Sequence, residues 1–288
     1  MSALTIAKRG LFWLMLLLLA GLFVIPYLFM ISNSFEEFSY VLPYPPKLLP
    51  SSLNFAAYTH VLTNTNLPQA VMNSLIISAS TVALVVLVSS LSAYGFARID
   101  FFGRETLFKL YLFTLMVPGF LSIIPQVLVL QSIRLPGLTG VGGLVGTRIG
   151  LILLYVGTGI CGNTFFLRGH FAALPKELEE SVYIDGGGHM VTFFKVMLPL
   201  MVPSIATLAI FCFQGTWEEF FSAKVVLGGV QKFVTMPLMI QTLYGQHATR
   251  WEWIFAASIL AQLPILFLFV VFQKRFVVTG LSEGSIKA

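Results

Sequence analysis

The 288-residue sequence is 57% hydrophobic and 10% charged, whereas a soluble domain carries about 25% charged residues. This composition excludes an ordinary soluble protein and indicates an integral membrane protein in contact with lipid. The net charge of +5 does not indicate a nucleic-acid partner, because the basic residues stand singly at the ends of apolar runs. Both cysteines, Cys161 and Cys212, lie within apolar runs and lack the spacing of a disulfide or a metal pair.

Apolar runs long enough to cross a bilayer, which takes about 20 residues, predict an all-α membrane protein with six transmembrane helices. The expected spans are Leu11–Ile31, Ala70–Ala97, Leu107–Ile133, Thr147–Arg168, Pro199–Ala223 and Ile254–Phe276. No small-residue cleavage site follows the first run, so we expect an uncleaved anchor and not a signal peptide.

Prolines mark three places in this pattern. Pro43, Pro45, Pro46 and Pro50 fall in the polar loop Ser32–Gln69, which we expect to be ordered by proline and not by a core. Pro118 and Pro125 fall within the third span and predict a kinked or broken helix, which a membrane tolerates only where neighbours or a cavity satisfy the freed carbonyls. Pro264 falls within the sixth span.

The lysines and arginines predict the orientation in the membrane. With the amino terminus in the cytoplasm, 11 of the 17 lie inside and six outside, as the positive-inside rule requires. The inside residues are Lys8, Arg9, Arg98, Arg104, Lys109, Arg168, Lys176, Lys195, Lys274, Arg275 and Lys287, and the outside residues are Lys47, Arg134, Arg148, Lys224, Lys232 and Arg250. Both termini and the loop between spans four and five are therefore expected to be cytoplasmic.

That loop, Leu174–Pro199, carries a cluster of charges between two apolar runs. Pro175 suits a first helical position, and Lys176–Ile184 are mostly helix formers. We predict a short amphipathic helix with Leu178 and Val182 one turn apart on its apolar side. Its acidic residues, near the positive end of the helix dipole, are Glu177, Glu179 and Glu180.

A glycine turn is expected to end this helix. Asp185 precedes Gly186–Gly188, and glycines supply backbone angles that a helix interior cannot use. Beyond the turn, Val191, Phe194 and Leu198 are expected to share one face of a second helix. The predicted local structure is helix, glycine turn, helix.

Residues 180–187 read Glu-Ser-Val-Tyr-Ile-Asp-Gly-Gly, and Leu198 and Pro199 follow. This run resembles the cytoplasmic EAA loop of ABC-importer permeases, whose pattern is Glu-Ala-Ala-x-x-Asp-Gly-Ala with Leu-Pro about a dozen residues later. In that family the loop is a coupling helix that docks in a cleft of the ATPase. The resemblance assigns ATPase coupling to Glu177, Glu180, Ser181, Val182, Asp185, Gly186 and Gly187.

This copy departs from the family pattern at Ser181, Val182 and Gly187, where alanines are usual. Small residues at two of these positions are expected to pack, whereas the branched Val182 changes the docking surface. The alternative interpretation is an ordinary amphipathic loop between two membrane helices.

Motifs for catalysis are absent from the sequence. It contains no Gly-Lys pair, so the phosphate-binding Walker loop is missing and the chain is not expected to hydrolyse ATP itself. Gly157, Gly159 and Gly162 match a dinucleotide-binding pattern, but they lie within an expected span, where small residues allow close helix packing. The four histidines lack metal-site spacing, so we expect no catalytic residue, metal or cofactor on this chain.

Polar residues in the fifth span predict a substrate path. Glu218 and Glu219 are adjacent carboxylates in an apolar run, where charge is costly and tends to be functional. Gln214 and Glu218 share a helix face, and Trp217 offers the aromatic ring that sugar recognition uses. The candidate cavity residues are Gln214, Trp217, Glu218, Glu219, Gln126 and Asn163. Alternatively, the carboxylates are hydrated near the outer interface or bonded to a neighbouring helix.

Nearly the whole chain resembles the MalG-like half of carbohydrate ABC importers, from Ile25-Pro26-Tyr27 to the tail after the last span. The resemblance implies a second, MalF-like permease, two copies of an ABC ATPase that hold ATP and Mg, and an extracytoplasmic sugar-binding protein in a prokaryotic inner or plasma membrane. The expected domains are an N-terminal helix with an external loop (1–69), a permease core (70–276) containing the coupling loop (174–199), and a cytoplasmic tail (277–288).

The expected function is thus a permease subunit that couples ATPase closure to alternating access for a carbohydrate. A polyol or glycerol phosphate is an alternative solute, although the lack of an intramembrane Arg or Lys cluster disfavours an anion. An ion-coupled secondary transporter is a second alternative, and it would need no docking helix. A membrane enzyme would need a nucleophile or metal constellation.

Overall fold

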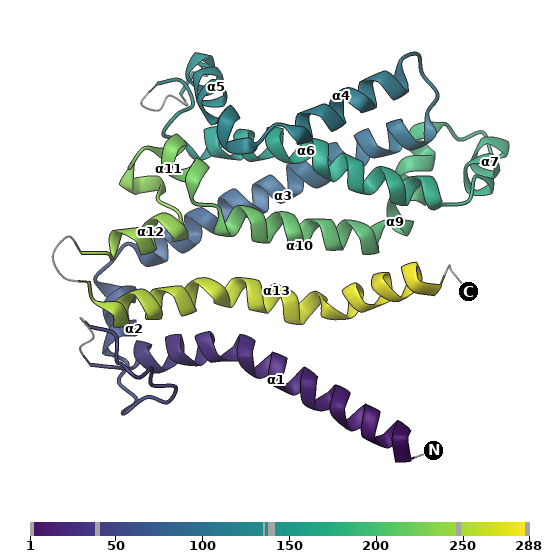
Figure 1. Ribbon diagram of the computed structural model, residues 1–288. Coiled ribbons are helices and arrows are strands. Elements are labelled where there is room, and N and C mark those ends of the chain that lie inside the picture. Colours follow the sequence, from purple (N-terminus) through teal and green to yellow (C-terminus); the bar gives the residue numbers. More distant parts are fainter. Residues whose placement is uncertain (1–2, 38–40, 135, 138–141, 246–248, 286–288) are drawn as a thin grey trace. The chain divides into compact units, whose positions relative to one another are not determined.

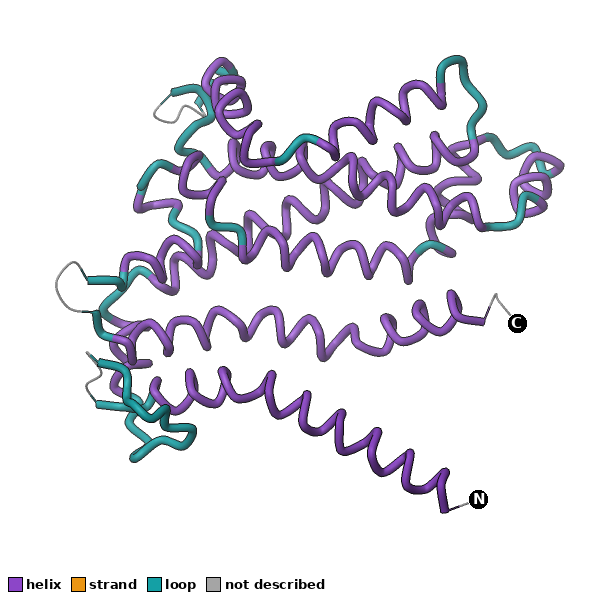
Figure 2. The backbone as a smooth tube through the Cα atoms, in the orientation of Figure 1, coloured by secondary structure: helices purple, strands orange, loops and turns teal. Residues whose placement is uncertain are grey.

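The computed structural model describes residues 3–37, 41–134, 136–137, 142–245 and 249–285, with side-chain surroundings for those between 8 and 272. Within these ranges the chain forms helices and loops (Figures 1 and 2). In chain order the helices are α1 Ala3–Ser34, α2 Ala56–Thr63, α3 Leu67–Arg98, α4 Arg104–Met116, α5 Gly119–Ser132, α6 Arg148–Ala173, α7 Glu177–Ile184, α8 His189–Val191, the π-helix η1 Thr192–Met197, α9 Leu198–Leu200, α10 Val202–Glu218, α11 Phe221–Leu227, the 3₁₀ turn η2 Gln231–Phe233, α12 Met236–Thr242 and α13 Trp251–Ser285.

Among the described residues, four helical segments are long and apolar enough to cross a membrane. They are Lys8–Ser34, Leu67–Arg98, Arg148–Ala173 and Trp251–Phe272. Two sharply bent helix pairs raise the number to six if each pair counts as one span. The prediction of an all-α membrane fold is confirmed.

The predicted third span is broken at Pro118, as its prolines indicated. α4 ends at Met116, α5 begins at Gly119, and the two axes differ by 106°. A proline disfavours helical angles in the residue before it, and Val117 is extended with φ −83° and ψ 119°. Pro125, in contrast, lies inside α5.

The predicted fifth span, Pro199–Ala223, is wrong as one continuous helix. The long helix is α10, Val202–Glu218, and it follows a bend of 75° after the segment His189–Leu200. Ala223 belongs to the separate helix α11.

The side chain of Glu219 explains why α10 ends where it does. Its carboxylate accepts hydrogen bonds from the backbone amides of Ser222 at 2.7 Å and Ala223 at 3.0 Å, and so starts α11. It also accepts one from the Tyr155 hydroxyl of α6 at 2.6 Å. Glu219 therefore joins three helices instead of continuing one.

The described chain divides into two compact units. One comprises Met1–Pro68 with Met239–Leu263, and the other Gln69–Leu238 with Pro264–Ala288. The predicted division differs, because it assigns 239–263 to the permease core. The predicted tail, 277–288, lies outside the residues whose side chains are described.

The loop after α1 has a small core of its own, which corrects the expectation that proline alone orders it. Phe35 packs edge-on against Phe55 at 5.2 Å and against Tyr58 at 5.4 Å, both measured between ring centroids. The Tyr58 hydroxyl hydrogen-bonds Ser34 at 2.8 Å, and Val61 of α2 is fully buried. The sequence pattern misses this core because its members come from two separate segments.

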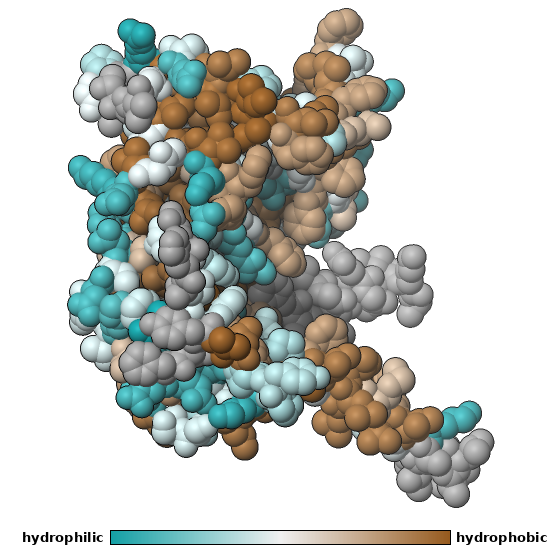
Figure 3. Space-filling model, turned by 60° about the vertical axis from the view of Figure 1, so that its left-hand side comes forward, coloured by the Kyte–Doolittle hydropathy of each residue, from teal (hydrophilic) through white to brown (hydrophobic). Residues whose placement is uncertain are grey.

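The surface of α1 is apolar over most of its described length (Figure 3). Leu11, Phe12, Trp13, Leu17 and Leu18 are each between 55% and 68% exposed. Apolar surface on this scale is stable only against lipid or another apolar helix.

The second unit has a core cluster at each end. One joins α6 near Tyr155 to α11 near Val226, and the other joins α3, α6 and η1 around Phe171 and Phe193. α7 lies at the end where α3 and α6 finish, and α11 lies at the opposite end (Figure 1).

Glu219→Ala is expected to lower the free energy of unfolding by about 3 kcal/mol, because hydrogen bonds to a charged group contribute about 1.5–3 kcal/mol each and do not simply add. Tyr155→Phe removes one of the three bonds and is expected to cost about half as much. Thermal unfolding of the purified chain in detergent measures both. A Glu219→Ala variant as stable as wild type would contradict the joining role.

Candidate functional site

The predicted coupling helix is α7, and it begins at Glu177, two residues after the predicted first helical position at Pro175. Lys176 is its N-cap residue, and Pro175 lies outside the helix. Glu177, Glu179 and Glu180 occupy the first turn, where the helix dipole favours negative charge.

α7 presents an apolar tip. Ile184 is 86% exposed, Tyr183 42% and, beyond the turn, Met190 67%, and α7 itself has no buried residue. On the other side Leu178 packs against the core cluster and Val182 is partly buried. The predicted apolar side is therefore correct, and exposed large apolar residues beside acidic ones suit a protein-docking surface.

The glycine turn has the geometry that its sequence predicts. Asp185 ends α7, and Gly186 adopts φ +79°, which only glycine adopts without strain. The amide of Gly186 donates to Tyr183 O at 3.0 Å, and that of Gly187 to Val182 O at 2.8 Å. This pair of bonds is a Schellman motif, which satisfies the carbonyls at the end of the helix.

The side chain of Val182 fills the space beside Gly187 across this turn. A Cβ atom at Gly187 would lie 2.5 Å from Val182 Cγ1, closer than Cβ atoms approach other atoms. It would also fit tightly against Val182 O at 3.1 Å and Val191 Cγ1 at 3.3 Å. The branched Val182 therefore occupies the room that an alanine at 187 would need. Relative to the alanines of the family pattern, the larger side chain at Val182 is therefore compensated by the smaller residue at Gly187.

A hydrogen bond closes the loop on itself. The Tyr183 hydroxyl lies 2.6 Å from His189 Nδ1, and the two rings meet edge to face. Partial burial, and next the Glu179 carboxylate, raise the pKa of Tyr183. The phenol therefore stays protonated, and its hydroxyl donates to Nδ1 or accepts from it according to the tautomer of the His189 ring.

The segment after the turn is a π-helix over 192–197, and it packs differently from the prediction. Phe193 is 1% exposed and faces the core, whereas Val191 and Phe194 are 40% and 51% exposed. Of the expected face, Leu198 packs against the core. The wider π-helical turn breaks the 3.6-residue period on which the prediction depends.

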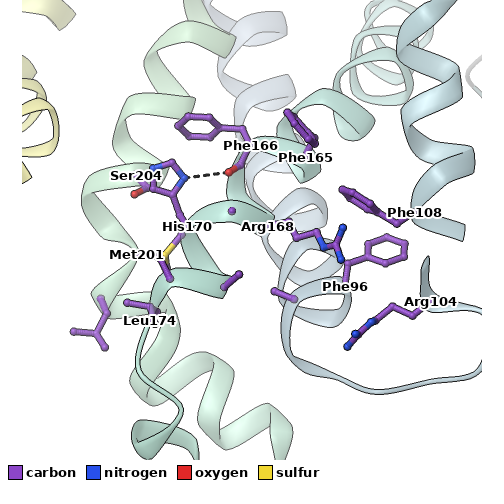
Figure 4. Close-up of a pocket in the computed structure, with 15 residues that line it drawn as sticks. Phe96, Arg104, Phe108, Phe165, Phe166, Arg168, His170, Leu174, Met201 and Ser204 are labelled. Atoms are coloured by element: carbon purple, nitrogen blue, oxygen red, sulfur yellow. Dashed lines mark hydrogen bonds between the residues drawn. The ribbon is translucent and has the colours of Figure 1, made fainter. Parts of the chain in front are cut away.

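A cavity of about 850 Å³ lies beside the base of this loop (Figure 4). Its lining residues are Phe96, Ala97, Arg104, Phe108, Phe165, Phe166, Arg168, Gly169, His170, Ala172, Ala173, Leu174, Leu200, Met201 and Ser204. Arg168 extends over the Phe108 ring, 3.8 Å from its centroid, and pairs with Glu105 at 2.8 Å. The walls are mainly apolar, with four phenylalanines among them, and none of the predicted substrate-path residues lines them.

Gln214 and Glu218 are both exposed and lie one turn apart on α10, as predicted. Trp217 differs from the expectation, because it is 2% exposed and its ring stacks on Phe213 with centroids 5.5 Å apart. In this conformation it supports α10 from within and offers no open face to a sugar.

The remaining candidates are separate from the α10 pair. Glu219 follows the alternative interpretation, since it is bonded to a neighbouring helix through Tyr155. Gln126 lines a cavity of about 460 Å³ and donates to Ser122 Oγ at 2.9 Å. Asn163 donates to Gly159 O within its own helix at 2.8 Å.

Sequence reasoning missed two residues at the base of the loop. The sequence pattern gives Arg98 only as a topology signal and gives Glu179 no coupling role. In the structure their side chains are 4% and 13% exposed and form an ion pair. One signal was available, because Glu179 lies three residues before Val182 and so shares the inward face of α7.

Residues 85–277, more than half of the chain, match the family described as binding-protein-dependent transport system inner membrane component. The chain belongs to this family. The resemblance to ABC-importer permeases is thereby confirmed: this is a transport permease subunit that resides in a membrane.

Two relatives illustrate the similarity. The diacetylchitobiose uptake system permease protein NgcG of Streptomyces coelicolor is 32% identical over 274 residues, 95% of this chain and 87% of that protein. The arabinooligosaccharides transport system permease protein AraQ of Halalkalibacterium halodurans is 34% identical over 239 residues, 83% of this chain and 81% of that protein.

A solved structure shares the fold. It is a bacterial ABC transporter involved in the import of the acidic polysaccharide alginate. The TM-score is 0.79 at 20% identity, over 95% of this chain and 98% of that chain.

Gly187→Ala is expected to loosen the coupling loop, because the added methyl group overlaps Val182, and overpacking costs about 1–3 kcal/mol. Trypsin, which can cleave after Lys176 and Lys195 on either side of the loop, is expected to cut this variant faster than wild type.

The double variant Val182→Ala with Gly187→Ala is the matched control, since it restores the alanine pair of the family pattern. Its cleavage rate is expected to return toward that of wild type. Equal rates for wild type and Gly187→Ala would contradict the filling of this space by Val182.

Proposed function

We propose that this permease imports a carbohydrate and that a separate ATPase drives it through α7. The carbohydrate assignment is supported by relatives that are permease proteins of a diacetylchitobiose uptake system, an arabinooligosaccharides transport system and an alpha-glucoside transport system. Membership in a binding-protein-dependent transport family favours this function over an ion-coupled transporter.

The observation that carries the coupling role is the exposed apolar tip of α7 beside its acidic first turn. Glu177, Glu180 and Asp185 are exposed and available to an ATPase cleft. The other proposed coupling residues shape the loop: Ser181 donates to Leu178 O at 3.0 Å, Gly186 makes the turn, and Val182 and Gly187 fill it.

The proposed orientation puts α7 and both chain ends in the cytoplasm. In the second unit, Arg98, Arg168 and Lys176 belong to the end that carries α7, and Arg148 and Lys224 to the opposite end. The cytoplasmic excess of basic residues supports this orientation in a prokaryotic inner or plasma membrane.

The proposed assembly contains a MalF-like second permease, two ABC ATPases that bind ATP and Mg, and an extracytoplasmic sugar-binding protein. The exposed apolar surface of α1 supports contact with lipid or with the second permease. The likeness to a transporter solved with a substrate-loaded periplasmic protein concerns the fold, at 19% identity.

Gln214 and Glu218 are the proposed cargo contacts. They are exposed on one face of α10, and amide and carboxylate oxygens bind sugar hydroxyls. Trp217, which is buried, and Glu219, which ends α10, are proposed to hold that face in place. Gln126 and Asn163 are proposed as secondary positions along the same path.

A photo-crosslinking residue in place of Ile184 is expected to capture a nucleotide-binding subunit in native membranes, with a yield that changes when ATP is added. The matched control replaces Phe120 of α5, which is 67% exposed. Capture from both positions, or from neither, would contradict the docking role of α7.

Glu218→Ala is expected to raise KM for transport about tenfold, the effect of losing one hydrogen bond to a charged group. Glu218→Gln keeps an acceptor and is expected to have a smaller effect. Uptake of labelled diacetylchitobiose, arabinooligosaccharides, maltose and glycerol phosphate into cells measures both the constants and the solute class. Unchanged kinetics would make Glu218 a structural residue, and uptake of glycerol phosphate alone would contradict the carbohydrate assignment.

A further inference from the structure

Arg98, the last residue of α3, caps a different helix. Its Nε donates to Phe171 O at 2.9 Å, and its Nη2 donates to Phe171 O at 2.6 Å and to Leu174 O. These are carbonyls of the last turn of α6, which lack the full set of partners that a helix interior provides. Phe171 O also accepts a bond from the amide of the C-cap residue Leu174 at 3.3 Å. A planar guanidinium can satisfy two such carbonyls at once, whereas an ammonium is a single point charge.

The same guanidinium faces the coupling helix. Glu179 Oε1 lies 3.7 Å from Arg98 Nε, and the two side chains are 13% and 4% exposed. Glu177 and Glu180, one residue or two away on α7, are exposed. Of the three carboxylates in the first turn of α7, Glu179 is therefore the one directed at the permease and not at a docking partner.

An aromatic cluster makes a second connection, one helical turn away. Tyr94 precedes Arg98 by four residues, and its ring lies 5.9 Å from that of Phe171 and 5.2 Å from that of Phe193. All three rings are buried. Phe193 belongs to the segment that leaves the coupling loop, and Glu179 to the segment that enters it.

The loop is thus fixed at both its ends to the same pair of helices. Glu179 connects its first helix to Arg98, and Phe193 connects its last segment to Tyr94. Phe171 of α6 takes part in both connections, with its carbonyl in one and its ring in the other. Packed side chains and ion pairs of this kind are the contacts through which energetic coupling between elements is carried.

We propose that Arg98 and Glu179 are positioning residues that make α3 and α6 follow the coupling helix when the ATPase moves it. This inference rests on the proposed docking of α7 to an ATPase. A buried ion pair contributes little net stability, because desolvation of the charges offsets their attraction. Its effect here is on position and not on stability, because it holds α7 against the end of α3.

The test measures whether α7 and α3 move together. Spin labels are placed at Lys176, the exposed N-cap residue of α7, and at Leu87 on α3, with Cys161 and Cys212 replaced by serine, in the importer copurified with its ATPase. The distance between labels is measured without nucleotide and after trapping with ATP, Mg and vanadate. In the otherwise wild-type chain, one narrow distance is expected in both states.

Glu179→Gln is expected to lose this single distance in the trapped state, because the neutral amide releases α7 from Arg98. ATP hydrolysis by the complex is expected to stay within about twofold of wild type, since the exposed docking residues are unchanged. A merely structural role would alter both nucleotide states equally. Arg98→Lys keeps the charge but loses the hydrogen bond to one carbonyl. Its label-to-label distances in the trapped state are expected to lie between those of wild type and of Glu179→Gln.

Asp100→Asn is the matched control. Asp100 pairs with Arg104 at 2.6 Å at the same end of the unit, but its side chain is 95% exposed, and such pairs contribute little. A Glu179→Gln complex that binds ATPase and keeps one narrow distance in both states would overturn the inference. Failure of the wild-type chain to copurify with any ATPase would instead contradict the proposed function.

Discussion

Helix ends within an apolar bundle must be satisfied by the protein itself, because lipid offers no hydrogen bonds. Arg98 satisfies carbonyls at the end of α6, and Glu219 satisfies amides at the start of α11. At the end of the second unit opposite α7, Asn73 donates to the carbonyls of Lys232 and Val234 and accepts from Arg148 at 2.5 Å. Each of these three junctions thus depends on a polar side chain that bonds the backbone of a different segment.

This constraint also explains why the polar residues of the spans divide into two kinds. Glu219 is committed to Tyr155 and to backbone amides, so it maintains the architecture. Glu218, its neighbour in sequence, has left the interior and shares an exposed face with Gln214. A single helix end separates the two roles, because the chain turns between these residues and sends their side chains to different surroundings.

Local signals predicted much of the fold. The apolar runs, the break at Pro118 and the turn at Gly186 each depend on neighbours in sequence, and the structure has them. The end of α10 could not be predicted, since Tyr155 lies 64 residues from Glu219. The pairing of Arg98 with Glu179 could not be predicted for the same reason, because the two residues lie far apart in the sequence. The buried face of the π-helix could not be predicted because its residues do not follow the 3.6-residue period of an α-helix.

The interlocked shapes of Val182 and Gly187 constrain how this loop can change over evolutionary time. Moving from this pair to the alanine pair takes two substitutions, and the order matters. Shrinking the valine first leaves a small void, whereas enlarging the glycine first creates a collision. Consensus engineering that corrects one position at a time can therefore damage the turn, while a loop transplanted whole from a relative with both alanines carries its own matching partner.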